Sequence, residues 1–177
     1  MELFRLTRVV AQSLLRPPLA PLEASRVALR VWPADLDLNL HMNNGRYLSL
    51  MDLGRFDLLG RMGLVREALR RKWRPMVGSA TVRFRRSLEP LQRYELVSRV
   101  VCWDEKWLFM EQNFEREGKI LASGLVKGLL RAPTGNVPSR ELFRLAGHDL
   151  ESPPIPEGIA LWQQAEERLA AARPRSA

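Results

Sequence analysis

The stretch that decides the fold reads Asp35-Leu36-Asp37-Leu38-Asn39-Leu40-His41-Met42-Asn43-Asn44-Gly45-Arg46-Tyr47. It places two carboxylates, one histidine and three asparagines directly before a helix-patterned apolar run. An asparagine at a helix start can accept a hydrogen bond from an early backbone N–H. The N–H groups and the dipole at that end favour a negative charge or a polarised carbonyl oxygen. A carboxylate facing such a helix end is the smallest set of groups that could attack an acyl carbon.

The segment that follows, from about Arg46 to Leu59, is apolar on more than one face. Such a pattern predicts a helix that is buried rather than resting on a surface. Gly54 would let another backbone come close to it. Asp52 is unusual there, because a buried carboxylate needs a partner. Arg55 lies three residues later on the same face and could supply one.

Strand-like patterns surround this helix. One strand covers residues 27–31, and four more are expected at residues 76–88, 94–103, 107–116 and 120–131. Short polar turns between successive strands indicate antiparallel neighbours. One apolar helix and one long sheet bury each other only if the sheet curls around the helix. We therefore expect an α+β fold whose remaining sheet edges are managed by pairing with a second subunit.

Both ends of the chain add helices to this core. Residues 2–16 have the spacing of an amphipathic helix, which either packs on the domain or a partner subunit or lies on an anionic membrane surface. Further helices are expected at residues 139–146 and 159–171. The expected organisation is an N-terminal helix (1–18), a central domain (19–135) and a C-terminal helical extension (136–177).

Composition narrows the classes of function. The 177 residues are 46% hydrophobic and carry a formal charge of +8, which suits one ordered domain with an anionic partner or simply a basic surface. The arginines are scattered without a nucleic-acid motif, so we expect no nucleic-acid partner. The single cysteine, Cys102, allows no intrachain disulfide, favours a reducing compartment and is most simply a buried apolar residue. No Cys/His cluster has metal spacing, so we expect no metal.

Asp37 is the main candidate for chemistry. Its carboxylate could attack a thioester carbonyl directly or take a proton from an attacking water. Backbone N–H groups at the helix start would stabilise the oxyanion. The alternative is that Asp35 and Asp37 only solvate or cap the loop. His41 could be an acid/base, a ligand or a hydrogen-bonding wall of a pocket, although a lone histidine is more often structural. Asn43 and Asn44 are, on first principles, caps rather than catalysts.

The motif Asp35-x-Asp37-x-x-x-His41-x-Asn43-Asn44-x-x-Tyr47-Leu48, with Asp52 and Arg55 beyond it, resembles one known family. It is similar to the 4-hydroxybenzoyl-CoA thioesterase-like branch of the hotdog-fold acyl-CoA thioesterases. The run from Val82 to Leu88 and the following turn also look like that family's second strand. Two positions depart from the family pattern, because Leu40 replaces a glycine and Asn39 stands two residues after Asp37. The variant looks closer to a sub-branch that includes the thioesterase superfamily member 6 proteins.

The resemblance implies a hotdog fold, with a curved antiparallel sheet wrapped around one long helix in a dimer or higher homo-oligomer. It implies that Asp37 is the catalytic carboxylate, that Asn44 or a neighbour supplies the oxyanion-binding N–H, and that His41 belongs to the catalytic loop. Substrate contacts are expected from the following side chains: Asn43, Tyr47, Asp52, Arg83 and Arg85. The arginines would meet the phosphates of CoA, although a strand face of arginines could equally be a solvated surface. No cofactor is needed beyond the CoA of the substrate.

Two functions remain open at this level. The first is hydrolysis of an acyl-CoA or related thioester by a cytoplasmic enzyme. The second is a non-catalytic hotdog module that binds acyl chains, lipids or partners at a membrane surface through residues 2–16.

Overall fold

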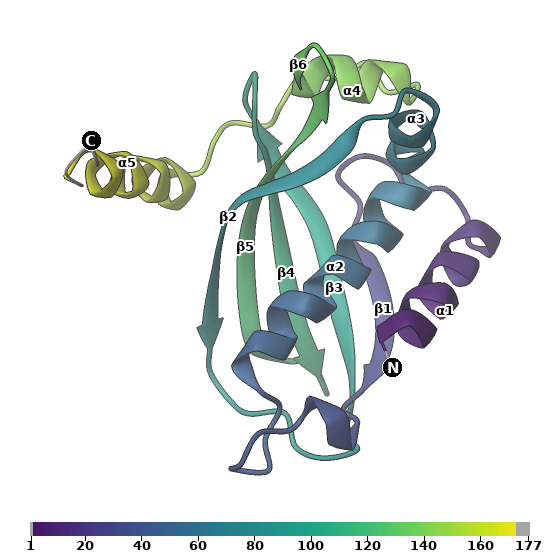
Figure 1. Ribbon diagram of the computed structural model, residues 1–177, viewed down its shortest axis with the longest axis vertical. Coiled ribbons are helices and arrows are strands. Elements are labelled where there is room, and N and C mark those ends of the chain that lie inside the picture. The colour runs from purple at the N-terminus through teal and green to yellow at the C-terminus, as the bar shows by residue number, and fades with distance from the viewer. Residues whose placement is uncertain (1, 173–177) are drawn as a thin grey trace.

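The computed structural model describes residues 2–172 and shows a curved antiparallel sheet wrapped around one long helix, α2 (Figure 1). This arrangement confirms the expected α+β class. In chain order the elements are α1 (Glu2–Leu15), β1 (Ser25–Arg30), the 3₁₀ turn η1 (Pro33–Asp35), α2 (Asn44–Arg61), α3 (Leu64–Arg70), β2 (Arg74–Phe84), β3 (Arg93–Trp103), β4 (Leu108–Arg116), β5 (Lys119–Ala132), β6 (Gly135–Val137), α4 (Ser139–Leu145) and α5 (Glu157–Ala171).

The strands are ordered β1-β3-β4-β5-β2, with β6 paired to β5, and every pairing is antiparallel. The strand predicted at residues 76–88 is too long, because β2 ends at Phe84. The N–H groups of Arg85 and Arg86 both donate to the carbonyl of Leu121, which breaks the regular ladder. The short strand β6 has no counterpart in the sequence prediction.

Helix α2 rests on the concave face of the sheet through its apolar residues. Its buried members include Tyr47, Leu50, Met51 and Leu58, as the apolar pattern predicted. Close contact depends on Gly54, where an added Cβ would lie 2.4 Å from the Ser98 hydroxyl on β3. The predicted close approach at this glycine is observed, but the nearest atoms belong to side chains of the sheet rather than to its backbone.

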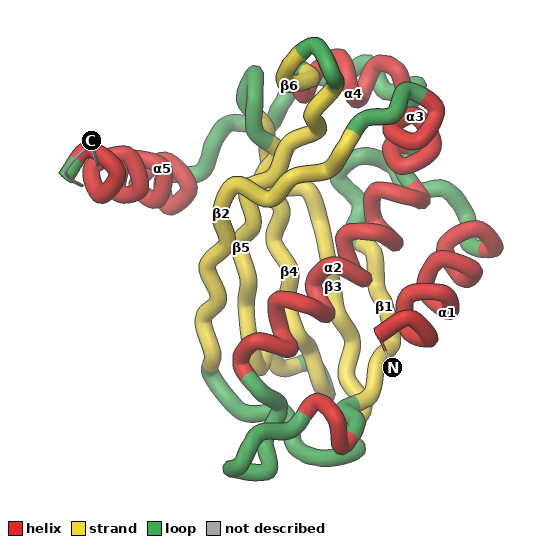
Figure 2. Tube along the Cα trace, viewed as in Figure 1, coloured by secondary structure: helices red, strands yellow, loops and turns green. Residues whose placement is uncertain are grey.

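Helix α1 packs beside α2 and lies along β1, the strand at one edge of the sheet (Figure 2). Three α1-side arginines donate to alternate carbonyls of β1. Arg16 donates to Arg26 (2.9 Å), Arg8 to Ala28 (2.8 Å) and Arg5 to Arg30 (3.0 Å). The predicted packing of this helix on the domain is thus observed. The side chains of Phe4, Leu14 and Leu15, in contrast, are exposed.

The convex face of the sheet is partly covered by α5, which then projects away from the domain (Figure 1). Ile159 and Trp162 of this helix pack with Cys102 and Phe109 of β3 and β4 in a second, smaller apolar cluster. Lys127 of β5 forms an ion pair with Glu166 on the same helix. These contacts join the C-terminal helix to the sheet, so it is packed at its start and exposed farther along.

Candidate functional site

The Asp37 loop, residues 36–42, folds back on itself before α2. The Asp37 N–H donates to the carbonyl of His41 (2.9 Å), and the Leu40 N–H donates to the carbonyl of Asp37 (3.1 Å). The Asp37 Oδ1 accepts the N–H of Asn39 (2.9 Å). Asp37 and His41 are half-buried. The carboxylate therefore helps to hold its own loop, as the capping alternative proposed, while part of it stays open to solvent.

Leu40 takes the left-handed backbone conformation in this loop, with φ of 58°. Glycine adopts that conformation without steric penalty, whereas a leucine Cβ crowds the neighbouring carbonyl. This explains physically why a glycine suits the position. In this chain the leucine itself adopts the left-handed conformation, and its side chain is exposed.

The start of α2 is capped by Asn43. Its Oδ1 accepts the Gly45 N–H at 2.8 Å, and Asn44 is the first residue of the helix. The predicted capping role of Asn43 is confirmed. The Asn43 N–H donates to the carbonyl of Asp35 at 2.8 Å, which joins the far end of the Asp37 loop to its beginning. The loop and the positive end of the α2 dipole are therefore held side by side.

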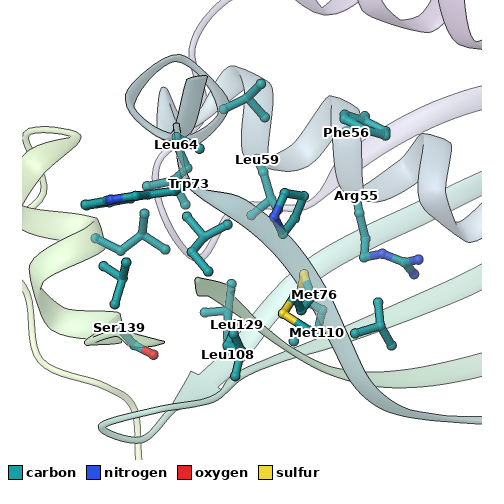
Figure 3. Close-up of a pocket in the computed structure, with 18 of the residues that line it drawn as sticks. Arg55, Phe56, Leu59, Leu64, Trp73, Met76, Leu108, Met110, Leu129 and Ser139 are labelled. Carbon is teal, nitrogen blue, oxygen red and sulfur yellow. The ribbon is translucent and has the colours of Figure 1, made fainter. Parts of the chain in front are cut away.

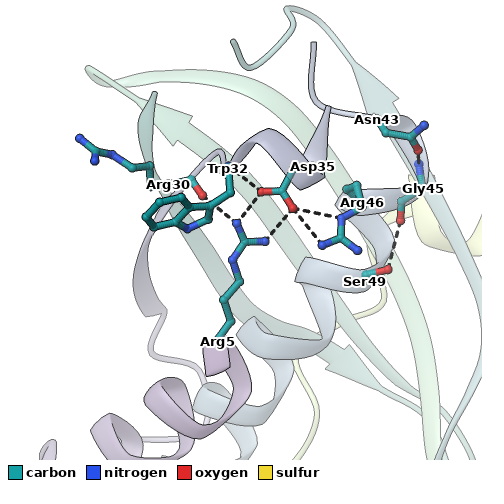
Figure 4. Close-up of polar contacts among 8 residues, drawn as sticks. All are labelled: Arg5, Arg30, Trp32, Asp35, Asn43, Gly45, Arg46 and Ser49. Carbon is teal, nitrogen blue, oxygen red and sulfur yellow. Dashed lines mark hydrogen bonds and ion pairs between the residues drawn. The ribbon is translucent and has the colours of Figure 1, made fainter. Parts of the chain in front are cut away.

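Asp35, the residue directly before the loop, is held by several hydrogen bonds and ion pairs (Figure 4). Its side chain is fully buried and accepts hydrogen bonds from Nη1 and Nη2 of Arg5, from Nη2 of Arg46 at 2.9 Å and from the Trp32 N–H at 2.8 Å. Burial would raise the pKa of this carboxyl, but hydrogen bonds from Arg5, the Trp32 N–H and Arg46 outweigh it and hold the pKa below its ordinary value. The alternative interpretation of Asp35, as a residue that solvates or caps the loop, is therefore half right: the buried side chain does not solvate the loop, but it caps η1 by accepting the Trp32 N–H.

The acidic residues of α2 are placed differently from the prediction. Asp52 was expected to be buried, but its side chain is 58% exposed and pairs with Arg55. The buried carboxylate is Asp57, which accepts the Ser25 hydroxyl at 2.5 Å and lies 3.6 Å from Arg61. A helix that is apolar on several sides does not reveal which of its charged positions faces inward.

Arg55 connects this helix to the sheet. It donates to the Gln112 Oε1 at 2.7 Å, and the Gln112 Nε2 donates to the Met51 carbonyl and the Ser98 hydroxyl, both at 2.9 Å. Burial lowers the pKa of Arg55, and the neighbouring Asp52 opposes that shift. The predicted Asp52–Arg55 pair is confirmed, and it belongs to a longer polar network.

An apolar cavity of about 230 Å³ opens beside this pair, between α2, α3, α4 and strand β2 (Figure 3). Its walls include Leu59, Trp73, Met76, Met110, Leu129 and Leu142. Asp52 and Arg55 are among its few polar neighbours, whereas residues 35–44 do not line it. The sequence did not predict this cavity, because its walls come from seven separate elements, α2, α3, β2, β4, β5, β6 and α4.

The other predicted substrate residues are dispersed. Tyr47 is buried, with its ring 5.0 Å from that of Phe84 and 4.8 Å from that of Phe114. Burial raises the pKa of its hydroxyl. Arg83 on β2 and Arg85 just beyond it are exposed. The structure thus brings together the Asp37 loop and the start of α2. The end of β2, with Arg83 and Arg85, lies beside them, because the Phe84 ring meets Tyr47 and the Met42 N–H donates to the Leu88 carbonyl at 2.9 Å. Asp52 lies farther along α2. The substrate roles of these residues stay predictions.

Metal and thiol chemistry find little support in the described part of the chain. Among residues 2–172, no group of three or more His, Cys, Asp or Glu side chains is placed to hold a metal ion. Cys102 is buried, and burial with the nearby Asp104 raises the pKa of its thiol to about 11. Within the same residues, no helix is both long and apolar enough to cross a bilayer.

The sheet wrapped on a buried helix, with a polar loop at the start of that helix, defines a hotdog-fold protein. The YbaW probable thioesterase from Escherichia coli has this fold, with a TM-score of 0.63, 20% sequence identity, and coverage of 70% of this chain and 96% of that one. The model of the thioesterase-like superfamily matches residues 31–163. The chain therefore belongs to the thioesterase-like superfamily.

Curated relatives agree with the sub-branch inferred from the loop. The chain is 35% identical over 136 residues to Protein THEM6 of Xenopus laevis and 37% identical over 136 residues to Protein THEM6 of Danio rerio. These matches cover 75% of this chain, and 63% and 65% of the two relatives. The chain thus spans a little under two thirds of the length of these relatives.

Proposed function

We propose that this protein hydrolyses acyl-CoA thioesters. The observation that carries the proposal is the Asp37 loop, held against the capped start of a buried helix in a member of the thioesterase-like superfamily. A half-exposed carboxylate beside a helix N-terminus combines a base or nucleophile with donors for an oxyanion. The activity would be located in the cytoplasm, as the single unpaired cysteine suggests.

In this mechanism Asp37 either attacks the thioester carbonyl or removes a proton from the attacking water. The negative charge that develops on the carbonyl oxygen is stabilised by N–H groups at the Asn44 end of α2. When water attacks, the carbon–sulfur bond breaks, the proton that Asp37 took from the water passes to the CoA thiolate, and the products are a carboxylic acid and free CoA. When Asp37 attacks, the same bond breaks and leaves a mixed anhydride between the acyl group and Asp37, which a water molecule then hydrolyses to the same products. His41 and Asn43 shape the loop that holds Asp37.

The acyl part of the substrate is proposed to be aliphatic, because the cavity beside α2 is lined almost entirely by apolar side chains. The Asp52–Arg55 pair would lie at its polar rim, and Arg83 and Arg85 would meet CoA phosphates. Asp52 follows Asn44 by eight residues, or about 12 Å along the helix. The thioester would therefore lie at the start of α2, and the cavity for the acyl chain would lie farther along the same helix.

A homodimer is part of the proposal. Strand β2 is the second edge of the sheet and exposes Met76, Val77 and Phe84. An open edge with apolar side chains is a template for pairing with another strand. A second copy along β2 would also lie next to the cavity, which Met76 and Val77 help to line.

The second candidate is a non-catalytic hotdog module at a membrane surface. It is favoured by the outward face of α1, where Phe4, Leu14 and Leu15 are 69%, 81% and 87% exposed on a chain of charge +8. An apolar face on a basic protein suits an anionic bilayer. In this version the cavity holds an acyl or lipid ligand that is not cleaved.

The test is release of free CoA from a panel of acyl-CoAs of increasing chain length. We expect turnover that falls by about 100-fold or more in Asp37→Ala, with Asp149→Ala, a substitution in the loop before α5, as the control that keeps activity. Unchanged turnover in Asp37→Ala would refute the role of that carboxylate. Acyl-CoA binding without turnover, together with binding to anionic vesicles that Leu14→Glu abolishes, would favour the second candidate.

A further inference from the structure

Arg5 lies at the point where the N-terminal helix meets the loop of the proposed catalytic site (Figure 4). It is only 3% exposed, which is rare for an arginine. Its guanidinium contacts both carboxylate oxygens of Asp35 and also donates to the Arg30 carbonyl at 3.0 Å. A planar guanidinium with two bonds to one carboxylate fixes the direction of that carboxylate as well as its charge.

Asp35, held in place by Arg5, in turn contacts residues just beyond the far end of the Asp37 loop. Its side chain accepts the Arg46 guanidinium from the first turns of α2 at 2.9 Å, and its carbonyl accepts the Asn43 N–H at 2.8 Å. Between these anchors, an isolated β-bridge joins Leu36 to Met42. One buried carboxylate therefore sets the position of the loop relative to the helix start.

Arg5 is outside the part of the chain that the superfamily model matches, residues 31–163. The arginine and the loop are therefore far apart in sequence and meet only through the packing of α1. Arg8, one turn later on the same helix, offers a comparison. It donates to the Ala28 carbonyl at 2.8 Å, but it is exposed, and this hydrogen bond is made to strand β1 rather than to Asp35.

We propose that Arg5 is a positioning residue for the Asp37 loop, so that α1 supports the proposed catalytic site from outside the residues that the superfamily model matches. Arg5 does not contact substrate in this scheme and acts through Asp35. The activity part of this inference rests on the proposed thioester hydrolysis, whereas the positional part stands on the loop alone.

The experiment compares Arg5→Ala with Arg8→Ala in the full chain by amide hydrogen exchange. In Arg5→Ala we expect exchange of residues 36–43 to rise by about tenfold or more while strands β3 and β4 keep their protection. Arg8→Ala should leave the loop unchanged. Arg5→Lys keeps the charge but loses the two-pronged contact, so it should restore part of the loop protection.

Turnover is a second measurement, and it should not change if Arg5 only stabilises the fold as a whole. Misplacing a reacting group by about 1 Å can lower rates about 100-fold. We therefore expect kcat for an acyl-CoA to fall by about 10- to 100-fold in Arg5→Ala, with KM within about twofold, because ground-state binding is unaffected. Arg8→Ala should keep both constants.

Two results would overturn the proposal: wild-type exchange in the loop of Arg5→Ala, or an equal rise of exchange across loop and strands. If Arg5→Ala does not fold, the same hydrogen-exchange comparison between Arg5→Lys and Arg8→Lys tests the proposal. If the wild-type protein cleaves no acyl-CoA, the proposed function fails, and the exchange data still decide whether Arg5 positions the loop.

Discussion

Gly54 sets how closely α2 approaches the sheet, and Gly54→Ala tests that contact. The added Cβ would lie 2.4 Å from the Ser98 hydroxyl and 2.8 Å from the Gln112 amide nitrogen, up to about 1 Å inside ordinary van der Waals contact. Either α2 must lift away from the sheet or the Ser98–Gln112 hydrogen bonds must break. Gly124, where a Cβ would meet Met51, repeats the same tight packing from the sheet side.

The expected loss of stability follows from these contacts. Overpacking costs about 1–3 kcal/mol, and disturbing a buried hydrogen-bond network costs about 1–3 kcal/mol more. Alanine favours a helix over glycine by about 1 kcal/mol, which offsets part of this. We therefore expect the free energy of unfolding to fall by about 1–5 kcal/mol. With a urea slope of about 2 kcal/mol/M, the unfolding midpoint should drop by about 0.5–2.5 M.

A matched control lies on the same helix. At Gly60 an added Cβ would meet the Ser13 hydroxyl at 3.5 Å, which is ordinary contact. Gly60→Ala should therefore leave the midpoint unchanged or raise it, because only the helix preference changes. The assay is urea unfolding followed by circular dichroism at neutral pH. Equal midpoints for Gly54→Ala and Gly60→Ala would refute the account of how α2 packs.

Three further predictions follow from other groups. Because the pKa of Asp35 is held below its ordinary value, this carboxyl stabilises the fold above the unfolded pKa of about 3.9, and the contribution is lost as pH falls through the folded pKa. Urea midpoints between pH 7 and pH 2 should fall more steeply in wild type than in Asp35→Asn, and parallel curves would contradict this. Burial of Cys102 and the raised pKa of its thiol, about 11, should make it react with a disulfide reagent only after unfolding, so rapid labelling of the native protein would count against the structure. Val77→Lys on the β2 edge should weaken dimerisation by about tenfold or more in light scattering, whereas Arg99→Ala on β3 should not.

Much of the fold could be predicted because it depends on local patterns. The apolar run after Tyr47 indicated a buried helix, and the short polar turns indicated antiparallel strands. The N-cap at Asn43 was also predictable, since capping uses neighbours along the chain. The end of β2 was missed because two N–H groups there share the carbonyl of Leu121, a residue of another strand.

The candidate site was only partly predictable for the same reason. The loop and Asp37 stand together in sequence, and the pattern identified them. The contact of Arg5 with Asp35 joins residues 30 apart, so no periodicity reveals it. Asp52 was taken for the buried acid of α2, whereas Asp57 has that role, because an apolar helix leaves its inward direction undetermined.

Arginines in α1 and just after it donate hydrogen bonds to the carbonyls of β1. These bonds limit how many copies of the chain could pair edge to edge. A sheet with two open ends can add strands without limit and grow into a fibre. Here one end is closed by Arg5, Arg8 and Arg16, and within residues 2–172 the long edge strand left to receive another chain is β2. In the dimer proposed above, two copies that meet through β2 would turn their closed β1 ends outward, so growth of a polymer would end at the pair.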